Sequence, residues 1–391
     1  MAPRRVNKPE PKDAVRRPSW RDWIDPRRVG WLRLLLVFVP AAVAAHFAGA
    51  SGSVQFVLAS LGIIPLAGLV GEATESLADR LGPGIGGLLN ATFGNAAELI
   101  IALFALFRGL DGVVKASLTG SIIGNLLLVL GASLLAGGTR HAIQRFNRTA
   151  AGVGATLMVL AASGLIVPAI FHGIVGPSAG AAEHRLSLAV AVILMVAYFL
   201  SLLFSLVTHK DVFNPKNEYK EAALHEKGAW SMAWAALVLL VATGFVAGMS
   251  EILVGAVEET SRALGLTEVF VGVIVVAIVG NAAEHSTAVL MALKNQMDLA
   301  VGIALGSALQ IALFVAPALV LVSYTRVRPM NLLFSPLEVI AVILAVLLAR
   351  MVAEDGESNW LEGAMLLLIY AILGMAFYHL PAPQQALSLR T

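Results

Sequence analysis

Gly94-Asn95-Ala96-Ala97-Glu98 stands inside a long apolar segment, and the same five residues return at Gly280-Asn281-Ala282-Ala283-Glu284, 186 positions later. The same offset pairs Glu72 with Glu258 without a gap. The chain is therefore interpreted as an internal duplication. A carboxylate is costly in hydrocarbon, so two of them at matching places predict a shared functional site.

The composition surrounding these motifs indicates a membrane protein. Hydrophobic residues make up 58% of the 391 residues, and charged residues only 13%. Most of such a chain cannot form the surface of a water-soluble domain. The composition therefore predicts an all-α polytopic membrane protein in a lipid bilayer. The absence of cysteine excludes disulfides, thiolate metal sites and cysteine nucleophiles. No nucleic-acid partner is expected, and the oligomeric state is left open.

Eleven apolar runs are long enough to cross about 30 Å of hydrocarbon as helices. The first run, with its arginine-rich start and Ala48-Gly49-Ala50, also fits a secretory signal with a cleavage site. Its removal would leave ten spans. The expected spans are 29–50, 54–78, 84–107, 112–136, 149–170, 186–208, 229–253, 268–293, 298–322, 331–353 and 360–380.

Basic residues beside the spans predict the orientation of the chain. Arginines crowd the first 33 residues, and four lysines lie between spans six and seven. The positive-inside rule therefore predicts a cytoplasmic N-terminus and an outside C-terminus. Two arginines, Arg326 and Arg328, fall on the outer side, contrary to the positive-inside rule.

The two copies of the motif lie in the third and eighth expected spans, so they run through the membrane in opposite directions. This is the inverted-repeat plan of secondary transporters. The predicted organisation is a basic cytoplasmic tail at 1–28, a first transmembrane helix at 29–50, a first five-helix repeat at 54–208, a cytoplasmic linker at 209–228 and a second five-helix repeat at 229–380.

The repeated motif supplies oxygen ligands. Asn95 and Glu98 are three residues apart, as are Asn281 and Glu284, so each pair is expected on one side of a helix. Facing repeats would surround one point with two carboxylates and two amide carbonyls, hard ligands that suit Ca²⁺. Further neutral oxygens on the next helix of each half are expected from Ser121, Asn125, Ser307 and Gln310.

A purely structural interpretation explains the small residues of the motif, because Gly, Asn and Ala let membrane helices pack closely. It does not explain Glu98 and Glu284. Two ionised carboxylates can be neutralised by one divalent cation or by two protons, and the empty, doubly charged site is costly. If only the neutralised forms cross, exchange is obligatory.

A second acidic set lies one helix earlier in each half: Glu72 and Glu75, and Glu251 and Glu258. These residues could relay protons or form part of a gate. The alternative is that they are helix-end carboxylates reaching solvent, which is favoured for Glu75 and Glu251 because the repeat does not pair them. Another acid, Glu338, follows Ser335 in a pattern typical of a helix-start capping box and is expected to be structural.

Three stretches resemble the calcium/proton exchanger (CAX) family of the calcium/cation antiporter superfamily. They are GNAAELIIALFAL from Gly94 to Leu106, VGNAAEHSTAVLMALKNQMD from Val279 to Asp298 and GSALQIALFVAP from Gly306 to Pro317. The resemblance implies one peripheral helix plus two inverted five-helix repeats that move Ca²⁺ against H⁺. Family members often carry a strongly acidic helix between the halves, whereas the linker here mixes acids with lysines.

Carried over by position, the resemblance implies that Glu98 and Glu284 are the central cation ligands and proton carriers, with Asn95 and Asn281 beside them. It also implies that Glu72 and Glu258 belong to mobile gating helices and hydrogen-bond the site. The resemblance further implies a cavity lined by Ser121, Asn125, Ser307 and Gln310.

The function predicted is a Ca²⁺/H⁺ antiporter of a bacterial inner membrane, with no enzyme activity and no cofactor, because Ca²⁺ is the transported substrate. The nearest alternative is a sodium/calcium or other monovalent cation/proton exchanger of the same superfamily. A cation channel could use the paired acids as a filter. An intramembrane hydrolase would need a nucleophile and base that the sequence does not assemble.

Overall fold

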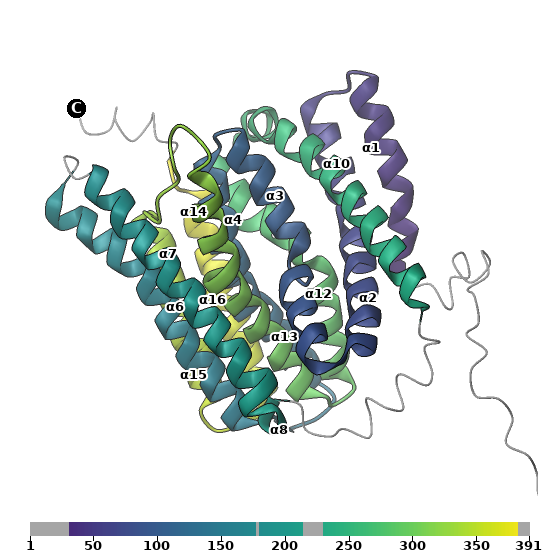
Figure 1. Ribbon diagram of the computed structural model, residues 1–391, viewed down its shortest axis with the longest axis vertical. Coiled ribbons are helices and arrows are strands. Elements are labelled where there is room, and N and C mark those ends of the chain that lie inside the picture. Colours follow the sequence, from purple (N-terminus) through teal and green to yellow (C-terminus); the bar gives the residue numbers. More distant parts are fainter. Residues whose placement is uncertain (1–30, 177–179, 214–229, 382–391) are drawn as a thin grey trace, which may run out of the picture.

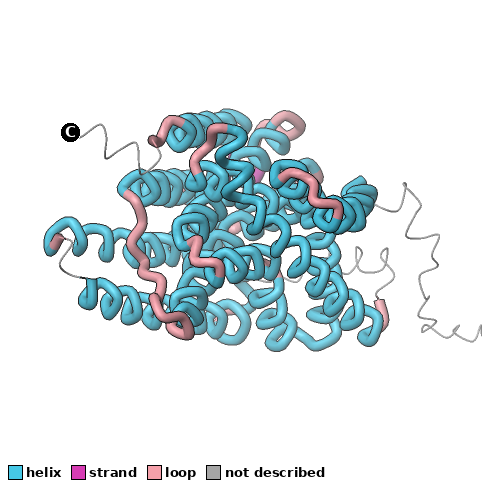
Figure 2. Tube along the Cα trace, turned by 90° about the horizontal axis from the view of Figure 1, so that it is seen from above, coloured by secondary structure: helices cyan, strands magenta, loops and turns pink. Residues whose placement is uncertain are grey.

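The protein is described by a computed structural model over residues 31–176, 180–213 and 230–381. The tail predicted at 1–28 and most of the predicted linker lie outside these residues. The described chain is helical almost throughout, as the ribbon of Figure 1 and the view from above in Figure 2 show. The predicted all-α polytopic fold is confirmed.

The helices of the two halves follow one another along the chain. The first half contains η2 (Trp31–Val37), α1 (Phe38–Phe47), α2 (Gly52–Phe93), α3 (Ala96–Phe107), α4 (Asp111–Ile123), η3 (Gly124–Val129), α5 (Leu130–Gly138), α6 (Arg148–Val175), α7 (Gly180–Leu203), η5 (Phe204–Thr208) and α8 (Lys210–Phe213). The second half contains α10 (Met232–Leu264), α11 (Glu268–Phe270), η6 (Val271–Val276), α12 (Ala277–Leu293), α13 (Met297–Gln310), η7 (Ile311–Val315), α14 (Ala316–Ser323), α15 (Pro336–Ala353) and α16 (Trp360–Tyr378).

In the described chain, nine helices are long and apolar enough to cross a membrane. Two shorter apolar helices, Arg33–Phe47 and Ala96–Phe107, accompany them. Each of these eleven segments overlaps one of the eleven predicted spans. A short antiparallel ribbon of β1 (Gln144–Arg145) and β2 (Glu357–Ser358) joins two of the connections.

The third predicted span, 84–107, is wrong as a single helix. Helix α2 continues to Phe93, the chain breaks at Gly94 and Asn95, and α3 begins at Ala96. Asn95 has φ −105° and ψ 31°, outside the helical range. The break allows the Asn95 side chain to turn toward residues of the second half.

Helix α2 also reverses direction before this break. A Cβ on Gly86 would lie 2.8 Å from the carbonyl carbon of Ala78. A straight helix would separate positions eight residues apart by about 12 Å, so the chain folds back between Ala78 and Gly86. Only a residue without a side chain allows this approach.

The tenth predicted span, 331–353, begins later than expected, at Pro336. The physical reason is the capping box. Ser335 Oγ accepts a hydrogen bond from the Glu338 N–H at 3.4 Å, and Glu338 Oε2 accepts one from the Ser335 N–H at 2.8 Å. The predicted structural role of Glu338 is therefore confirmed.

The duplication extends to irregularities of the backbone. Helices α4 and α13 each pass into a π-helical turn, η3 and η7, and the positions 186 residues after η3 are 310–315. Such turns frequently mark functional sites because they displace a side chain from the regular helical position. Asn125 lies in η3, and Gln310 immediately precedes η7.

Helices α2 and α10 pack lengthwise in opposite directions, as expected of inverted repeats. The N–H of Gly52, at the start of α2, donates to Glu259 Oε1, near the end of α10, at 2.6 Å. With α1, this pair forms one side of the bundle, while α6, α7 and α15 form the other (Figure 1). Of the most apolar part of Asp111–Gly138, 83% is buried, against 17% for Gly180–Thr208, so the helix carrying Ser121 and Asn125 lies near the centre.

Candidate functional site

Six neutral polar side chains from both halves meet near the centre of the bundle. They come from the break before α3, from α4 and η3, and from α12 and α13. Five of them are between 0% and 4% exposed: Asn95, Ser121, Asn125, Asn281 and Ser307. Gln310, at the end of α13, is the sixth. All six are among the predicted ligands.

Ser307 is the hub of this network. Asn125 Nδ2 donates to Ser307 Oγ at 3.0 Å, and Ser307 Oγ donates to Asn95 Oδ1 at 3.0 Å. Asn95 Nδ2 in turn donates to Gln310 Oε1. These bonds tie the start of α3 and the π-turn η3 of the first half to α13 of the second.

Asn281 is held on its donor side. Its Nδ2 donates to Ser121 Oγ at 3.1 Å and to the carbonyl of Ala277 at 2.9 Å. Both amide hydrogens are then used, which leaves Oδ1 facing Asn125, whose Nδ2 lies 3.3 Å away. Asn281 lies inside the continuous helix α12, whereas Asn95 precedes α3, so the predicted matching helical placement is wrong for Asn95.

Glu98 lies in the first turn of α3, is 6% exposed and packs on the second copy of the motif. A Cβ on Gly280 would lie 3.1 Å from Glu98 Oε1. Glu284 is four residues beyond Gly280, one turn along α12.

Two oxygen acceptors of this region are buried and have no hydrogen-bond donor among the described residues: Glu284 Oε2 and Asn125 Oδ1. Buried polar atoms are normally satisfied, so each such atom needs an explanation. A carboxylate oxygen and an amide oxygen without donors are suitable ligands for a hard cation such as Ca²⁺. The donor set therefore fits a cation as the transported substrate.

The four other predicted acids are not brought to this network. Glu72, Glu75, Glu251 and Glu258 are all exposed on α2 and α10. Glu72 forms an ion pair with Arg33 of η2, and Glu258 Oε2 accepts from Arg262 Nη2 at 3.0 Å. The expectation that Glu72 and Glu258 hydrogen-bond the site is wrong for this structure.

The reason lies in the helix face. Successive residues of a helix point about 100° apart, and the face of α2 turned toward its neighbours carries Ala73 and Thr74, which are 0% and 1% exposed. Glu72 is left on the side of η2, where Arg33 meets it. Sequence reasoning missed this partner, although a charge within the first apolar run was a visible signal.

Comparisons with known proteins found a matching family profile and similar chains. The family profile described as "Sodium/calcium exchanger protein" matches residues 51–207 and 234–378. A Ca(2+)/H(+) antiporter of Synechocystis sp. is 46% identical over 369 residues, covering 89% of this chain and 97% of its own length. The Ca(2+)/H(+) antiporter ChaA of Bacillus subtilis is 45% identical, with 88% of this chain and 99% of its own covered.

Two solved structures have the same fold. The structure of native YfkE is 42% identical and has a TM-score of 0.78, covering 89% of this chain and 100% of its own. An H+/Ca2+ exchanger, CAX, is 14% identical with a TM-score of 0.62, covering 89% of this chain and 91% of its own, and so shares the fold.

Proposed function

The chain belongs to the sodium/calcium exchanger protein family, and on that premise we propose that it is a secondary active antiporter exchanging Ca²⁺ for H⁺. Relatives that match nearly the whole chain at 45–46% identity are named Ca(2+)/H(+) antiporters. The observation that carries the proposal is the pair of repeat-related carboxylates, Glu98 and Glu284, in a region where the neutral Asn125 Oδ1 is buried without a hydrogen-bond donor among the described residues.

Sodium/calcium exchange is the second candidate. A sodium-calcium exchanger, NCX_Mj, has a TM-score of 0.53 but only 17% identity, so this similarity concerns the fold alone. The much higher identity to proteins named for proton coupling favours Ca²⁺/H⁺ exchange. A channel and an enzyme are less favoured, because the family is one of transporters.

Glu98 and Glu284 would hold the cation and the protons in turn. Together they carry two negative charges, which one Ca²⁺ or two protons cancel. Leaving both ionised in a buried site is unfavourable, because desolvated charges need a partner. The site therefore passes between the two membrane faces only when loaded, and loading by one substrate excludes the other.

The neutral residues would complete the shell around the cation. Asn281 has both amide hydrogens occupied, so its carbonyl oxygen is oriented before the ion arrives. Such preorganisation lowers the cost of binding. The same role is proposed for Asn95 and Asn125, with Ser121, Ser307 and Gln310 as further oxygen donors or as residues that orient the amides.

Glu72, Glu75, Glu251 and Glu258 remain proposed residues of a proton pathway or gate. What supports them is their place on α2 and α10, the antiparallel pair that packs beside the motif helices. The pairing of Glu72 with Arg33 means that α2 has to move relative to η2 before this carboxylate can serve the central site.

The protein is a multi-pass membrane protein, and we propose the bacterial inner membrane as its location. Relatives from Bacillus subtilis and Synechocystis support this assignment. The basic residues at the start of the chain support a cytoplasmic N-terminus and an outside C-terminus. Residues 54–208 and 229–380 are proposed as the two repeats.

Uptake of radioactive calcium into proteoliposomes tests the exchange. An imposed pH gradient is expected to drive uptake at least about tenfold above an equal sodium gradient, because protons and Ca²⁺ compete for the same two carboxylates. Uptake driven by sodium alone would favour the sodium/calcium exchanger, and single-channel currents would favour a channel.

Ser307→Ala is expected to weaken Ca²⁺ binding more than Ser121→Ala. Ser307 joins two hydrogen bonds between the halves, and Ser121 accepts one. At about 1 kcal/mol per bond, the half-saturating Ca²⁺ concentration should rise roughly 30-fold and roughly fivefold. The dependence of uptake on external Ca²⁺ measures both values, and equal effects would contradict Ser307 as the hub.

A further inference from the structure

A crevice of about 260 Å³ lies between α6, α7 with η5, α8 and α13. One end, called the outer end because it lies at the membrane surface, is lined by Asn147, Ser205 and Asp298. The opposite, inner end is lined by Gly306 and Gln310. Asn147 caps the first turn of α6 and also donates from Nδ2 to the carbonyl of Val212 in α8 at 2.8 Å. The outer end therefore lies where these membrane helices terminate.

The length of the crevice matches one leaflet of a bilayer. Asp298 and Gln310 both line it and are twelve residues apart on α13, which is about 18 Å along a helix. Half of a hydrocarbon core is about 15 Å. The crevice thus runs from the end of the membrane helices to about mid-membrane depth.

The walls between these ends are mostly aliphatic, and Tyr198 and Ser201 of α7 are the polar side chains among them. The aliphatic residues are Val153, Leu157, Leu202, Val301, Leu305 and Leu309. At the outer end, the Asn147 N–H donates to Asp298 Oδ1 at 2.5 Å, and Ser205 Oγ donates to the carbonyl of Leu202 at 3.4 Å. The aliphatic part of the walls offers no oxygen ligand to replace the water around a hydrated cation, so it does not suit an ion path.

Two glycines of α13, Gly302 and Gly306, leave empty space along this wall of the crevice. A Cβ added to Gly302 or to Gly306 would meet no atom within 4 Å. Gly302 is exposed on a membrane-spanning helix. The space in front of them is accordingly not used by the packing of the described residues.

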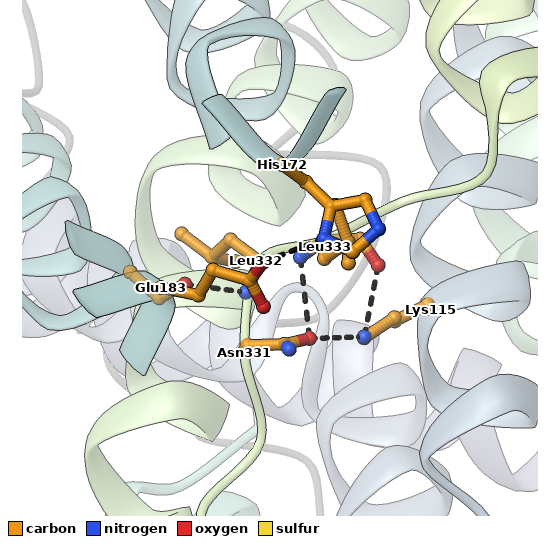
Figure 3. Close-up of polar contacts among 7 residues, drawn as sticks. Lys115, His172, Glu183, Asn331, Leu332 and Leu333 are labelled. Atoms are coloured by element: carbon orange, nitrogen blue, oxygen red, sulfur yellow. Dashed lines mark hydrogen bonds and ion pairs between the residues drawn. The ribbon is translucent and has the colours of Figure 1, made fainter. Parts of the chain in front are cut away.

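The repeat-related place in the other half is filled by the chain itself. The 186-residue offset relates Val301 to Lys115 and Leu305 to Thr119. Lys115 Nζ donates to Asn331 Oδ1 at 2.5 Å and to the Leu333 carbonyl at 2.9 Å, as Figure 3 shows.

The same filled region continues toward α15 and α7. Thr119 donates to Glu338 Oε1 at 3.3 Å, and the Leu332 N–H donates to Ser187 Oγ at 3.0 Å. A long polar side chain and a loop thus close this half. In the second half, the matching positions are Val301 and Leu305, and the crevice beside them remains open.

We propose that this crevice binds one acyl chain of a bilayer phospholipid, with the head group beside Asn147, Ser205 and Asp298. A largely aliphatic channel one leaflet long, with a polar mouth where the membrane helices end, has the chemical pattern of such a lipid. The volume is just below the roughly 300–1,000 Å³ of sites for drug-sized ligands, which suits a single narrow chain. The terminal carbons would lie against Gly306 and Gln310.

Photocrosslinking tests this site without reference to transport. The full chain is reconstituted with a phospholipid that carries a diazirine near the end of one acyl chain, and labelled residues are mapped by mass spectrometry. Labelling is expected to concentrate on Leu202 and on residues 301–310. Gly302→Leu, which fills the crevice, should reduce this labelling at least about tenfold.

Gly173→Leu is the matched control, because Gly173 is another open glycine, near the far end of α6. It should leave the labelling unchanged. Gly302→Ala provides a milder variant if the leucine variant does not fold, and a partial loss is expected from it. Labelling spread evenly over all lipid-facing helices, labelling unaffected by either Gly302 variant, or labelling only by a free fatty-acid probe would overturn the proposal.

Discussion

Glu98→Gln and Glu284→Gln are each expected to lower pH-driven Ca²⁺ uptake at least about 100-fold while the protein still inserts and folds. Glutamine has nearly the same shape as glutamate but cannot ionise. The site would keep a single negative charge, too little to cancel a divalent ion. Losing one partner of a buried charge interaction costs about 2–5 kcal/mol, and a 100-fold loss, about 2.8 kcal/mol, lies within that range.

Glu338→Gln is the matched control for this prediction. Glu338 is 5% exposed and Glu98 is 6% exposed, so the two acids are buried to the same degree. Glu338 caps α15 and accepts from Thr119 instead of facing the centre. Its variant should fold less stably but transport per folded molecule should persist. Uptake in proteoliposomes, normalised to monodisperse protein, distinguishes the outcomes, and normal transport by Glu98→Gln would move the cation site elsewhere.

Gly120→Ala and Gly306→Ala are expected to have opposite effects on stability, although the repeat pairs these two positions. A Cβ on Gly120 would lie 2.6 Å from the backbone carbonyl carbon of Val273, where α4 crosses η6. Backbone cannot rotate away, so forcing the helices apart should cost about 3 kcal/mol. A Cβ on Gly306 meets open space, and the substitution should gain up to about 1 kcal/mol of helix propensity.

The melting temperatures of both variants in detergent measure this difference. Gly120→Ala should melt well below the parent protein, and Gly306→Ala at or slightly above it. Equal destabilisation of both would mean that the two halves pack alike around these glycines, contrary to the asymmetry of the crossing at Val273.

Much of the fold was predictable because spanning a bilayer is a local requirement. An apolar run of sufficient length must form a helix that satisfies its own backbone, so the number and order of the spans follow from the residues themselves. The central site was predictable for a related reason. Acids and amides are kept inside apolar runs only at a cost, so Glu98, Asn125 and Glu284 could be selected before their neighbours were known.

The outer acids could not be assigned in the same way. Whether a residue on a helix faces the centre or the surroundings depends on the rotation of that helix against its neighbours, and a shift of one position turns a side chain by about 100°. Glu72 therefore meets Arg33, a residue 39 positions earlier, instead of the motif. No pattern within α2 contains that information.

The repeated motif separates the two kinds of determination. Two copies of Gly-Asn-Ala-Ala-Glu, at equal places in an apolar duplication, by themselves determined a membrane protein of inverted halves with an acid-and-amide centre. Only the tertiary structure decided that the first copy breaks its helix at Asn95 while the second continues through Asn281. Identical residues have identical local preferences, so the difference comes from their partners: Asn95 bonds to Gln310 and Ser307, whereas Asn281 bonds to Ala277 of its own helix and to Ser121.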